Sequence, residues 1–369
     1  MILSNLDQIL AKIEGLQSDG GELADGLFAA RRTNLILGYE RPDTTIFFTA
    51  VVVFTLQRLK KYLPPNLQTR IDKLAERAVV NYPDFENKDG LKTYNFWQTK
   101  PSKHFPNGYV FRHFDHFRIP DDTDDTAMVY LTTQPTFEEN QWLKHKLSLH
   151  ANLSTQQIKN TFGGYRSLRA YSTWFGKKMY VEFDACVLCN VLYWVFENKM
   201  PLNQHDKDSL AYIASVVQTD QYRTEPFRVA HQYPRTAVIM YHVARLLGAF
   251  EIEELESIRD KLTADGRAEL QNASSEMDKI ILQTALMWLT KQAPAADLGT
   301  QMPTFDQIND PNFYFFIAGL LTAYEAPILY KWAKNSLFHI RWQCEAFSWT
   351  LYFENQVLRS ALRKSSLGR

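Results

Sequence analysis

Helical periodicity is the feature that most constrains the fold of this chain. In about a dozen segments, apolar residues recur at the spacing of one face of an α-helix. We expect helices at residues 3–16, 43–62, 68–80, 124–132, 137–150, 183–198, 206–219, 235–247, 252–262, 268–289, 313–324 and 338–362. Because these segments do not alternate with strand patterns, we expect an all-α fold.

Aromatic and polar segments separate the expected helices. They lie at residues 93–97, 104–108, 163–166 and 231–234, and a short strand pair is expected around Tyr94 and Tyr109. Because such loops recur between helices, we favour helix pairs arranged in a ring over an irregular bundle. In a ring the loops would gather at one mouth, and the inner helices would line a central cavity.

Composition narrows the functional classes. With 369 residues, 45% of them hydrophobic, and no linker-like segment, the chain is expected to be a single domain spanning residues 1–369. Lys+Arg and Asp+Glu are equal at 41 each, which disfavours nucleic-acid binding. The N-terminus lacks a signal-peptide pattern and the apolar run at residues 46–56 is too short to span a bilayer, so we expect no transmembrane segment and a cytoplasmic protein.

Four aspartates within five positions stand directly before an apolar helical run. They are Asp121, Asp122, Asp124 and Asp125, and Pro120 precedes them. The proline and the aspartates indicate a helix start, with Asp121 assigned to the cap. If the cluster is even partly buried, charge repulsion forces at least one carboxyl to hold a proton near neutral pH. The cluster is therefore either a helix start or a proton-handling site.

Residues 122–128 read Asp-Thr-Asp-Asp-Thr-Ala-Met and resemble a signature of class II terpene cyclases of the copalyl diphosphate synthase type. They are more loosely similar to the aspartate box of squalene-hopene cyclases. The resemblance implies a double ring of helices, an (α/α)6 toroid, with short β-hairpin-like rim loops. It also implies that Asp124 is the general acid that protonates an alkene or epoxide of an isoprenoid, with Asp122 and Asp125 as its flanking carboxyls.

Such a reaction creates a carbocation, which needs a dry cavity with aromatic walls. A diphosphate substrate would also need basic side chains. The candidate substrate-binding residues are Tyr94, Trp97, Tyr165, Arg166, Trp174, Asn190, Trp194 and Arg235. The alternative for each aromatic residue is that it fills the core.

The segment that follows Trp174 is similar to an inner helix of bacterial terpenoid-cyclase-like toroids, in which an acidic residue opens the helix and an asparagine follows. Asp184 and Asn190 occupy these positions. Asp184 is an N-cap or a catalytic group. Asn190 lies on an otherwise apolar helix, where a buried amide needs partners, so we expect it to face the cavity.

Histidines and cysteines are further candidate functional groups. His113 and His116 precede the aspartates and would tune Asp124 by hydrogen bonding; a metal site is the less favoured alternative. Cys186 and Cys189 fall within an apolar helix, which indicates buried thiols instead of a zinc site. No metal centre is predicted.

The chain also departs from the family it resembles. Full class II cyclases bring a second helical domain against the box, and this chain is too short for both. A homodimer, a partner protein or a self-contained cavity would have to close the site. Protonation requires no cofactor, although Mg²⁺ could assist the binding of a diphosphate.

Two other functions remain open. A carbohydrate-active (α/α)6 hydrolase or lyase could use the carboxyls for acid–base chemistry and the rim aromatics for sugar stacking. A non-catalytic toroid would use the aspartates as a helix cap and its rim to bind a partner.

Overall fold

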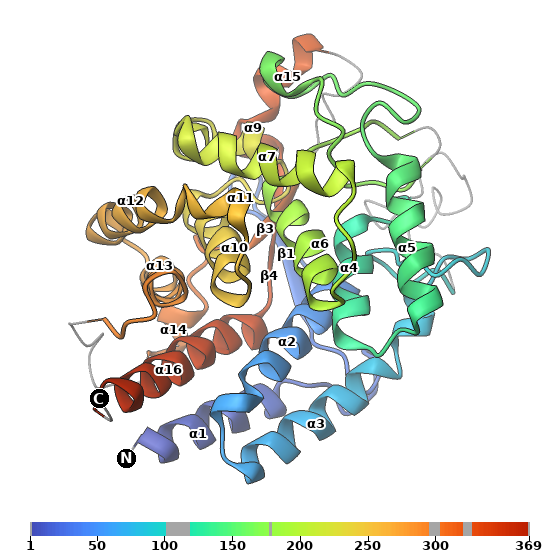
Figure 1. Ribbon diagram of the computed structural model, residues 1–369. Helices are drawn as coiled ribbons and strands as arrows, with labels where there is room; N and C mark the ends of the chain where they lie inside the picture. Colours follow the sequence, from blue (N-terminus) through green and yellow to red (C-terminus); the bar gives the residue numbers. More distant parts are fainter. Residues whose placement is uncertain (1, 101–118, 177–178, 295–302, 320–326, 368–369) are drawn as a thin grey trace.

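The computed structural model describes residues 2–100, 119–176, 179–294, 303–319 and 327–367. Within these residues, six helices form a closed inner ring in which each helix packs against the next. They are α2 (Ile46–Leu59), α4 (Thr123–Thr132), α6 (Ala185–Glu197), α10 (Thr236–Ala249), α13 (Glu276–Thr290) and α16 (Glu345–Leu367). Figure 1 is viewed roughly along the axis of the ring, and the chain passes round the ring once from α2 to α16.

Further helices cover the outside of the ring. They are α1 (Ile2–Gly15), α3 (Pro65–Val79), α5 (Phe137–His150), α7 (Gln204–Gln218), α12 (Arg259–Asn272) and the short α14 (Phe305–Ile308). The inner α2 is apolar and buried on nearly all sides, whereas the outer α3 buries one stripe, with Leu67, Ile71 and Leu74 among its residues. The expected all-α (α/α)6 toroid is therefore confirmed.

Short helical segments join these elements. They are η1 (Lys60–Tyr62), η2 (Tyr82–Phe85), η5 (Gly163–Tyr165), α8 (Gln221–Thr224), α9 (Pro226–Val229), α11 (Glu253–Glu256), α15 (Pro327–Ala333) and η6 (Ser336–Phe338). Close approach of two inner helices requires Gly248 on α10, because a Cβ there would lie 2.6 Å from a ring carbon of Trp288 on α13.

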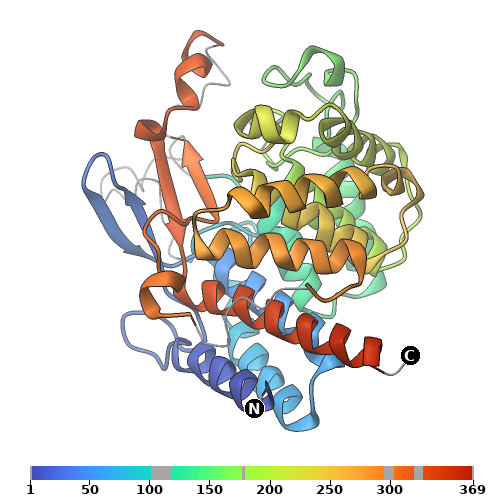
Figure 2. The same ribbon diagram turned by 90° about the vertical axis from the view of Figure 1, so that its left-hand side faces the viewer.

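A small antiparallel sheet stands at one end of the helices, as Figure 2 shows. Its order is β2 (Tyr39–Asp43), β1 (Ala30–Asn34), β4 (His339–Gln343), β3 (Phe316–Gly319). In its register Arg32 pairs with Trp342, which also pairs with Phe316. Because β2 and β4 run directly into α2 and α16, the sheet lies beside the starts of these inner helices.

This sheet corrects several helix predictions. Residues 313–324 and the first part of 338–362 were expected to be helical, but β3 and β4 occupy these segments. Both strands are rich in aromatic and β-branched residues, which favour a pleated surface. The expected helix at 268–289 is also wrong, because the chain breaks at residues 273–275 between α12 and α13. Tyr94 forms only isolated bridges, and Tyr109 lies outside the described residues.

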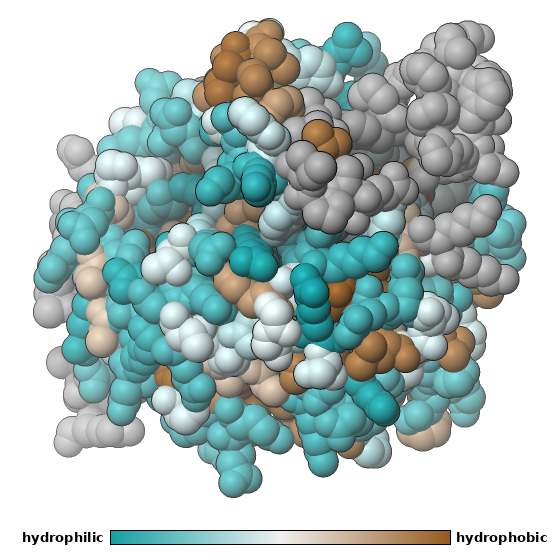
Figure 3. Space-filling view, turned by 90° about the horizontal axis from the view of Figure 1, so that it is seen from above, coloured by the Kyte–Doolittle hydropathy of each residue, from teal (hydrophilic) through white to brown (hydrophobic). Residues whose placement is uncertain are grey.

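The side of the toroid seen in Figure 3 is mostly hydrophilic, with small apolar areas. Exposed apolar side chains include Leu35, Ile36 and Leu37 in the turn between β1 and β2. No helix among the described residues is long and apolar enough to cross a membrane.

Candidate functional site

The inner helices begin at the same end of the ring, because an outer segment returns the chain after each of them. We call this end, next to the sheet, the N-terminal end, and the opposite one the C-terminal end. The four aspartates belong to the N-terminal end, since they occupy the start of α4. All four are buried, with between 1% and 9% of each residue exposed.

The start of α4 is held between two neighbouring segments. Asp122 forms isolated antiparallel bridges with Tyr94 on one side and Trp174 on the other. The backbone N–H of Asp122 donates to the carbonyl of Tyr94 at 3.1 Å, and the N–H of Thr123 donates to the carbonyl of Thr173 at 2.8 Å. Tyr94 and Trp174 are half-buried and flank the cluster.

The N-cap of α4 is Asp122, whose carboxylate accepts from the N–H of Asp125 at 2.6 Å. The assignment of Asp121 to the cap is therefore wrong, because the extended segment continues through Asp121. The Asp121 carboxylate instead accepts from Thr93 Oγ1 at 2.6 Å and Asn87 Nδ2 at 2.5 Å. It fixes the neighbouring loop.

Asp124 points into a buried polar network. Asn190 Nδ2 on α6 donates to its Oδ1 at 2.6 Å, and the Tyr233 hydroxyl donates to its Oδ2. Burial raises the pKa of Asp124, while these two donors and the positive charge of Arg245 oppose that rise. Asp124 is thus the carboxyl of the cluster whose ionised form has side-chain donors and a cation in its favour.

Asp122 and Asp125 behave as a coupled pair. Within the described residues, no donor reaches either carboxyl oxygen of Asp125, and burial together with the charge of Asp122 raises its pKa well above the usual range. Burial raises the pKa of Asp122 to about 7, although its contacts with Asp125 partly oppose the rise. Because two adjacent buried carboxyls cannot both ionise at low cost, the pair retains a proton near neutral pH.

Asp184 opens the neighbouring inner helix. It caps α6 by accepting from the N–H groups of Cys186 and Val187 at 2.9 and 3.3 Å, and its other oxygen accepts from the N–H of Gln232 at 2.8 Å. The prediction that Asp184 is an N-cap is therefore confirmed. Burial raises the pKa of Asp184 to about 7, and the charge of Asp124 adds to this rise.

The structure disperses the remaining predicted substrate-binding residues. Trp97 donates to Asp43 beneath the sheet, Tyr165 bonds to Ser215 and Gln221, and Trp194 donates to Asn140 on α5. Arg166 is exposed and Arg235 pairs with Asp278 of α13. Of the predicted set, Asn190 contacts Asp124, whereas Tyr94 and Trp174 adjoin Asp122. His113 and His116 lie outside the described residues.

Tyr233 and Arg245 are the members of the network that sequence reasoning missed. Tyr233 follows α9 in a loop expected only to line the rim, and Arg245 interrupts an apolar inner helix. The sequence signal for Arg245 was a charge amid apolar neighbours, comparable to the polar amide of Asn190 on its apolar helix. The sequence gives no indication of which residue it meets.

Other chemistry lies apart from the aspartates. Cys186 and Cys189 are buried free thiols, as expected, and burial raises the pKa of both. Among the described residues no three His, Cys, Asp or Glu side chains gather as a metal site. A cleft of about 730 Å³ opens at the C-terminal end, between the ends of α10 and α13 and the start of α12.

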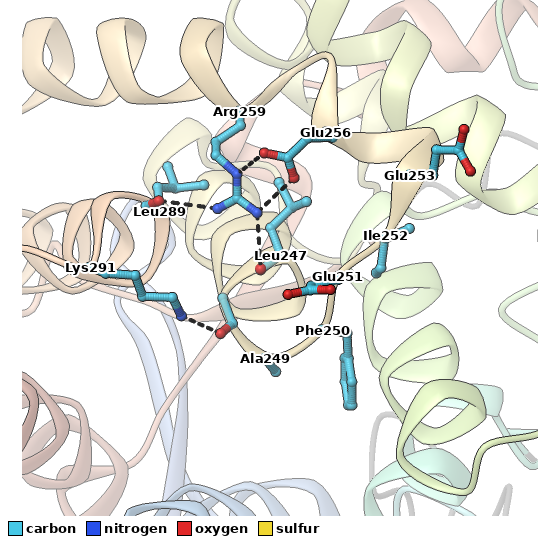
Figure 4. A pocket seen from close by; sticks show the side chains of 11 residues that line it. Leu247, Ala249, Phe250, Glu251, Ile252, Glu253, Glu256, Arg259, Leu289 and Lys291 are labelled. Carbon is cyan, nitrogen blue, oxygen red and sulfur yellow. Dashed lines mark hydrogen bonds and ion pairs between the residues drawn. The ribbon is translucent and has the colours of Figure 1, made fainter.

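Figure 4 shows that the two cations in this cleft, Arg259 and Lys291, are hydrogen-bonded to neighbouring groups. Arg259 forms an ion pair with Glu256 at 2.5 Å and donates to the carbonyls of Leu289 and Leu247 at 3.1 and 3.3 Å. Lys291 donates to the carbonyl of Gly248. Both cations thus satisfy carbonyls at the ends of inner helices.

No protein-family model matches the chain, and no curated protein matches it. One solved structure that it resembles is described as an unsaturated glucuronyl hydrolase specific for heparin. The two share 10% sequence identity, and the match covers 98% of each chain with a TM-score of 0.48.

The class II terpene cyclase interpretation is wrong. The contacts give the physical reason. Both carboxyl oxygens of Asp124 accept hydrogen bonds, from Asn190 and Tyr233, so the group is held as an acceptor and not as the proton donor that a cyclase needs. Trp97, Tyr165 and Trp194 contact separate parts of the fold instead of forming one aromatic wall. An isoprenoid substrate is therefore not retained. That catalysis needs no cofactor, and that a partner closes the site, stay predictions.

Proposed function

We propose that the protein is a carbohydrate-active enzyme, a glycoside hydrolase that works at the N-terminal end of its ring. One observation carries the proposal. The start of α4 combines a pair that holds a proton, Asp122 and Asp125, with a carboxylate that receives two donors, Asp124. Glycoside hydrolysis requires such a division between a carboxylic acid and a carboxylate.

The assignment follows from the surroundings of each group. Asp122 would transfer the shared proton to the leaving-group oxygen, because Asp125 is more deeply buried, at 1% exposed against 7%. Asp124 would act as the base that activates water. The half-buried Tyr94 and Trp174 beside Asp122 offer aromatic surface next to these carboxyls.

Incubation of the purified chain with neutral and acidic oligosaccharides, followed by mass spectrometry, tests the proposal. A hydrolase adds water at the cleaved bond, whereas a lyase leaves an unsaturated product. We expect hydrolysis, and we expect Asp124→Asn to lower turnover about 10²–10⁴-fold, the usual contribution of general acid–base catalysis.

The matched control is Asp265→Asn on α12, which removes a carboxylate bonded to Lys261 and Tyr222 away from the N-terminal end. It should keep turnover near that of the unaltered protein. Turnover of no oligosaccharide, or an Asp124→Asn variant as active as the unaltered protein, would reject the proposal. Circular dichroism melting confirms that each variant folds.

A non-catalytic binding toroid is the second candidate. It is favoured by the structural use of Asp122 and Asp184 as helix caps and of Asp121 as a loop anchor. Calorimetric binding of an oligosaccharide without any product would favour this function over hydrolysis.

A further inference from the structure

Arg245 is a buried cation inside the inner ring. It lies on α10 with 4% of the residue exposed, and its guanidinium stands over the rings of Phe54 and Tyr241 at 5.0 and 5.2 Å. Its Nη2 donates to Asn190 Oδ1 at 2.5 Å. The guanidinium of Arg245 thus donates to the neutral amide of Asn190 on α6, and this amide in turn donates to Asp124.

Asn190 can connect the two charges in one orientation only. A guanidinium has donors and no acceptor, so it must face the amide oxygen. The amide nitrogen then points away from Arg245 and donates to Asp124 Oδ1 at 2.6 Å. Arg245 therefore determines which end of the Asn190 amide meets the carboxylate.

Arg245 also differs in the sign of its charge from the other ionisable groups near Asp124. The ionisable groups coupled electrostatically to Asp124 are Asp122, Asp125, Asp184, Cys186, Cys189, Tyr233 and Arg245. Of these described groups, Arg245 alone carries positive charge. On its other side stands Glu354 of α16, which accepts from Tyr241 and Trp288 at 2.6 and 2.9 Å.

We propose that Arg245 is a positioning residue that acts through Asn190 to keep Asp124 ionised and correctly oriented. The inference rests on the proposed function, since it assigns the support for the proposed base. Arg245 touches no substrate in this account. Its effect reaches the site through one hydrogen-bonded amide and through the charge of the guanidinium.

The pH dependence of hydrolysis by Arg245→Met separates this role from simple packing. Methionine keeps apolar bulk in the ring but removes the charge and the donors. A base must be ionised to act, so activity rises with pH through the pKa of Asp124. We expect the acid limb of the profile to move to higher pH, with lower kcat and little change in KM, and Arg245→Lys to restore part of the shift.

A second variant protects the test against misfolding. Asn190→Ala leaves Arg245 in place and breaks the connection, and it should move the acid limb in the same direction. The double variant should add little to the larger single effect, because both residues act along one path. Additive effects, or an unmoved acid limb in folded variants, would overturn the inference.

The pKa of Asp124 measured by carbon-detected NMR gives a readout that does not need a substrate. If no sugar is hydrolysed, the proposed function fails, yet the inference about Arg245 still predicts a higher pKa of Asp124 in Arg245→Met. Glu354→Gln is the control of opposite sign, because it removes a negative charge beside Arg245 and should not raise the pKa of Asp124. An equal rise in both variants would show a general loss of packing and reject the role of Arg245.

Discussion

The two ends of the inner ring treat charge differently. At the C-terminal end, Arg259 and Lys291 satisfy carbonyls at the ends of α10 and α13. At the N-terminal end, Asp122 and Asp184 cap the starts of α4 and α6. Both arrangements follow the helix dipole, which favours cations at helix C-termini and carboxylates at N-termini.

Asp125 breaks this symmetry. Both of its carboxyl oxygens are buried and receive no donor from the part of the chain that the structure describes, and it lies beside the capping carboxylate of Asp122. Helix capping accounts for the cations of the cleft, but it does not account for Asp125, a second buried carboxyl whose pKa is raised by burial and by the charge of Asp122. The difference between the ends therefore supports the proposal that the site lies at the N-terminal end, where the sequence departs from what stability alone favours.

The largest expected effect that tests this contrast between the two ends is a pH dependence of the free energy of unfolding. The pKa of Asp122 rises from 3.8 to about 7 on folding, so the folded state binds this proton more tightly than the unfolded chain. This contribution is fully present below the unfolded pKa and is lost as pH rises through about 7. At about 1.4 kcal/mol per pKa unit, it amounts to about 4 kcal/mol.

Asp125→Asn should flatten the pH dependence of the pair. The amide does not titrate, so the contribution from the raised pKa of Asp125 is lost, while the amide can still donate to Asp122 and lower its pKa. Urea unfolding at several pH values between the unfolded and folded pKa measures it. Glu256→Gln at the C-terminal end should leave the slope near pH 7 unchanged, because its hydrogen bond with Arg259 lowers the pKa of Glu256. If Asp125→Asn keeps the slope of the unaltered protein, the coupled pair does not exist in solution.

Removal of the Asp184 carboxylate should cost less. In Asp184→Ala the N–H groups of Cys186, Val187 and Gln232 lose their acceptor. The loss of a cap together with an unpaired buried donor predicts a decrease of about 2–3 kcal/mol in the free energy of unfolding.

Asn203→Ala is the matched control, since Asn203 caps the outer helix α7 through a similar bond. Because its surroundings are partly open to water, we expect about 1 kcal/mol. Chemical unfolding of both variants decides the point. Equal losses would show that Asp184 is an ordinary cap and that the N-terminal end is not special in this respect.

Local pattern predicted the ring but not its sheet. The apolar face of a helix is encoded by residues close together in the sequence, so α5 has its expected bounds, Phe137–His150. The segments that form β3 and β4 are too short for their pattern to separate strand from helix. The strand character of β4 depends on pairing with β1, about three hundred positions distant in the chain, and that of β3 depends on pairing with β4.

At the site, too, features set by neighbouring residues could be predicted from the sequence, whereas contacts between distant residues could not. Four neighbouring aspartates predicted a helix start and a shared proton, but the seven-residue box did not fix the chemistry. Asn190 was singled out as an amide on an apolar helix. Its meeting with Asp124, and that of Tyr233 with Asp124, join residues 66 and 109 positions apart, which only closure of the ring brings together.

The smallest effect concerns the C-terminal end. Arg259→Gln removes a cation from the ends of α10 and α13, where a charge of this kind contributes about 0.3–1 kcal/mol that salt weakens. We expect a slightly lower melting temperature at low salt, a smaller difference at high salt, and unchanged hydrolysis. Because the side chain also pairs with the exposed Glu256, no larger loss is expected. A loss of stability as large as that of Asp184→Ala would place an equally demanding site in the cleft and abolish the contrast between the two ends.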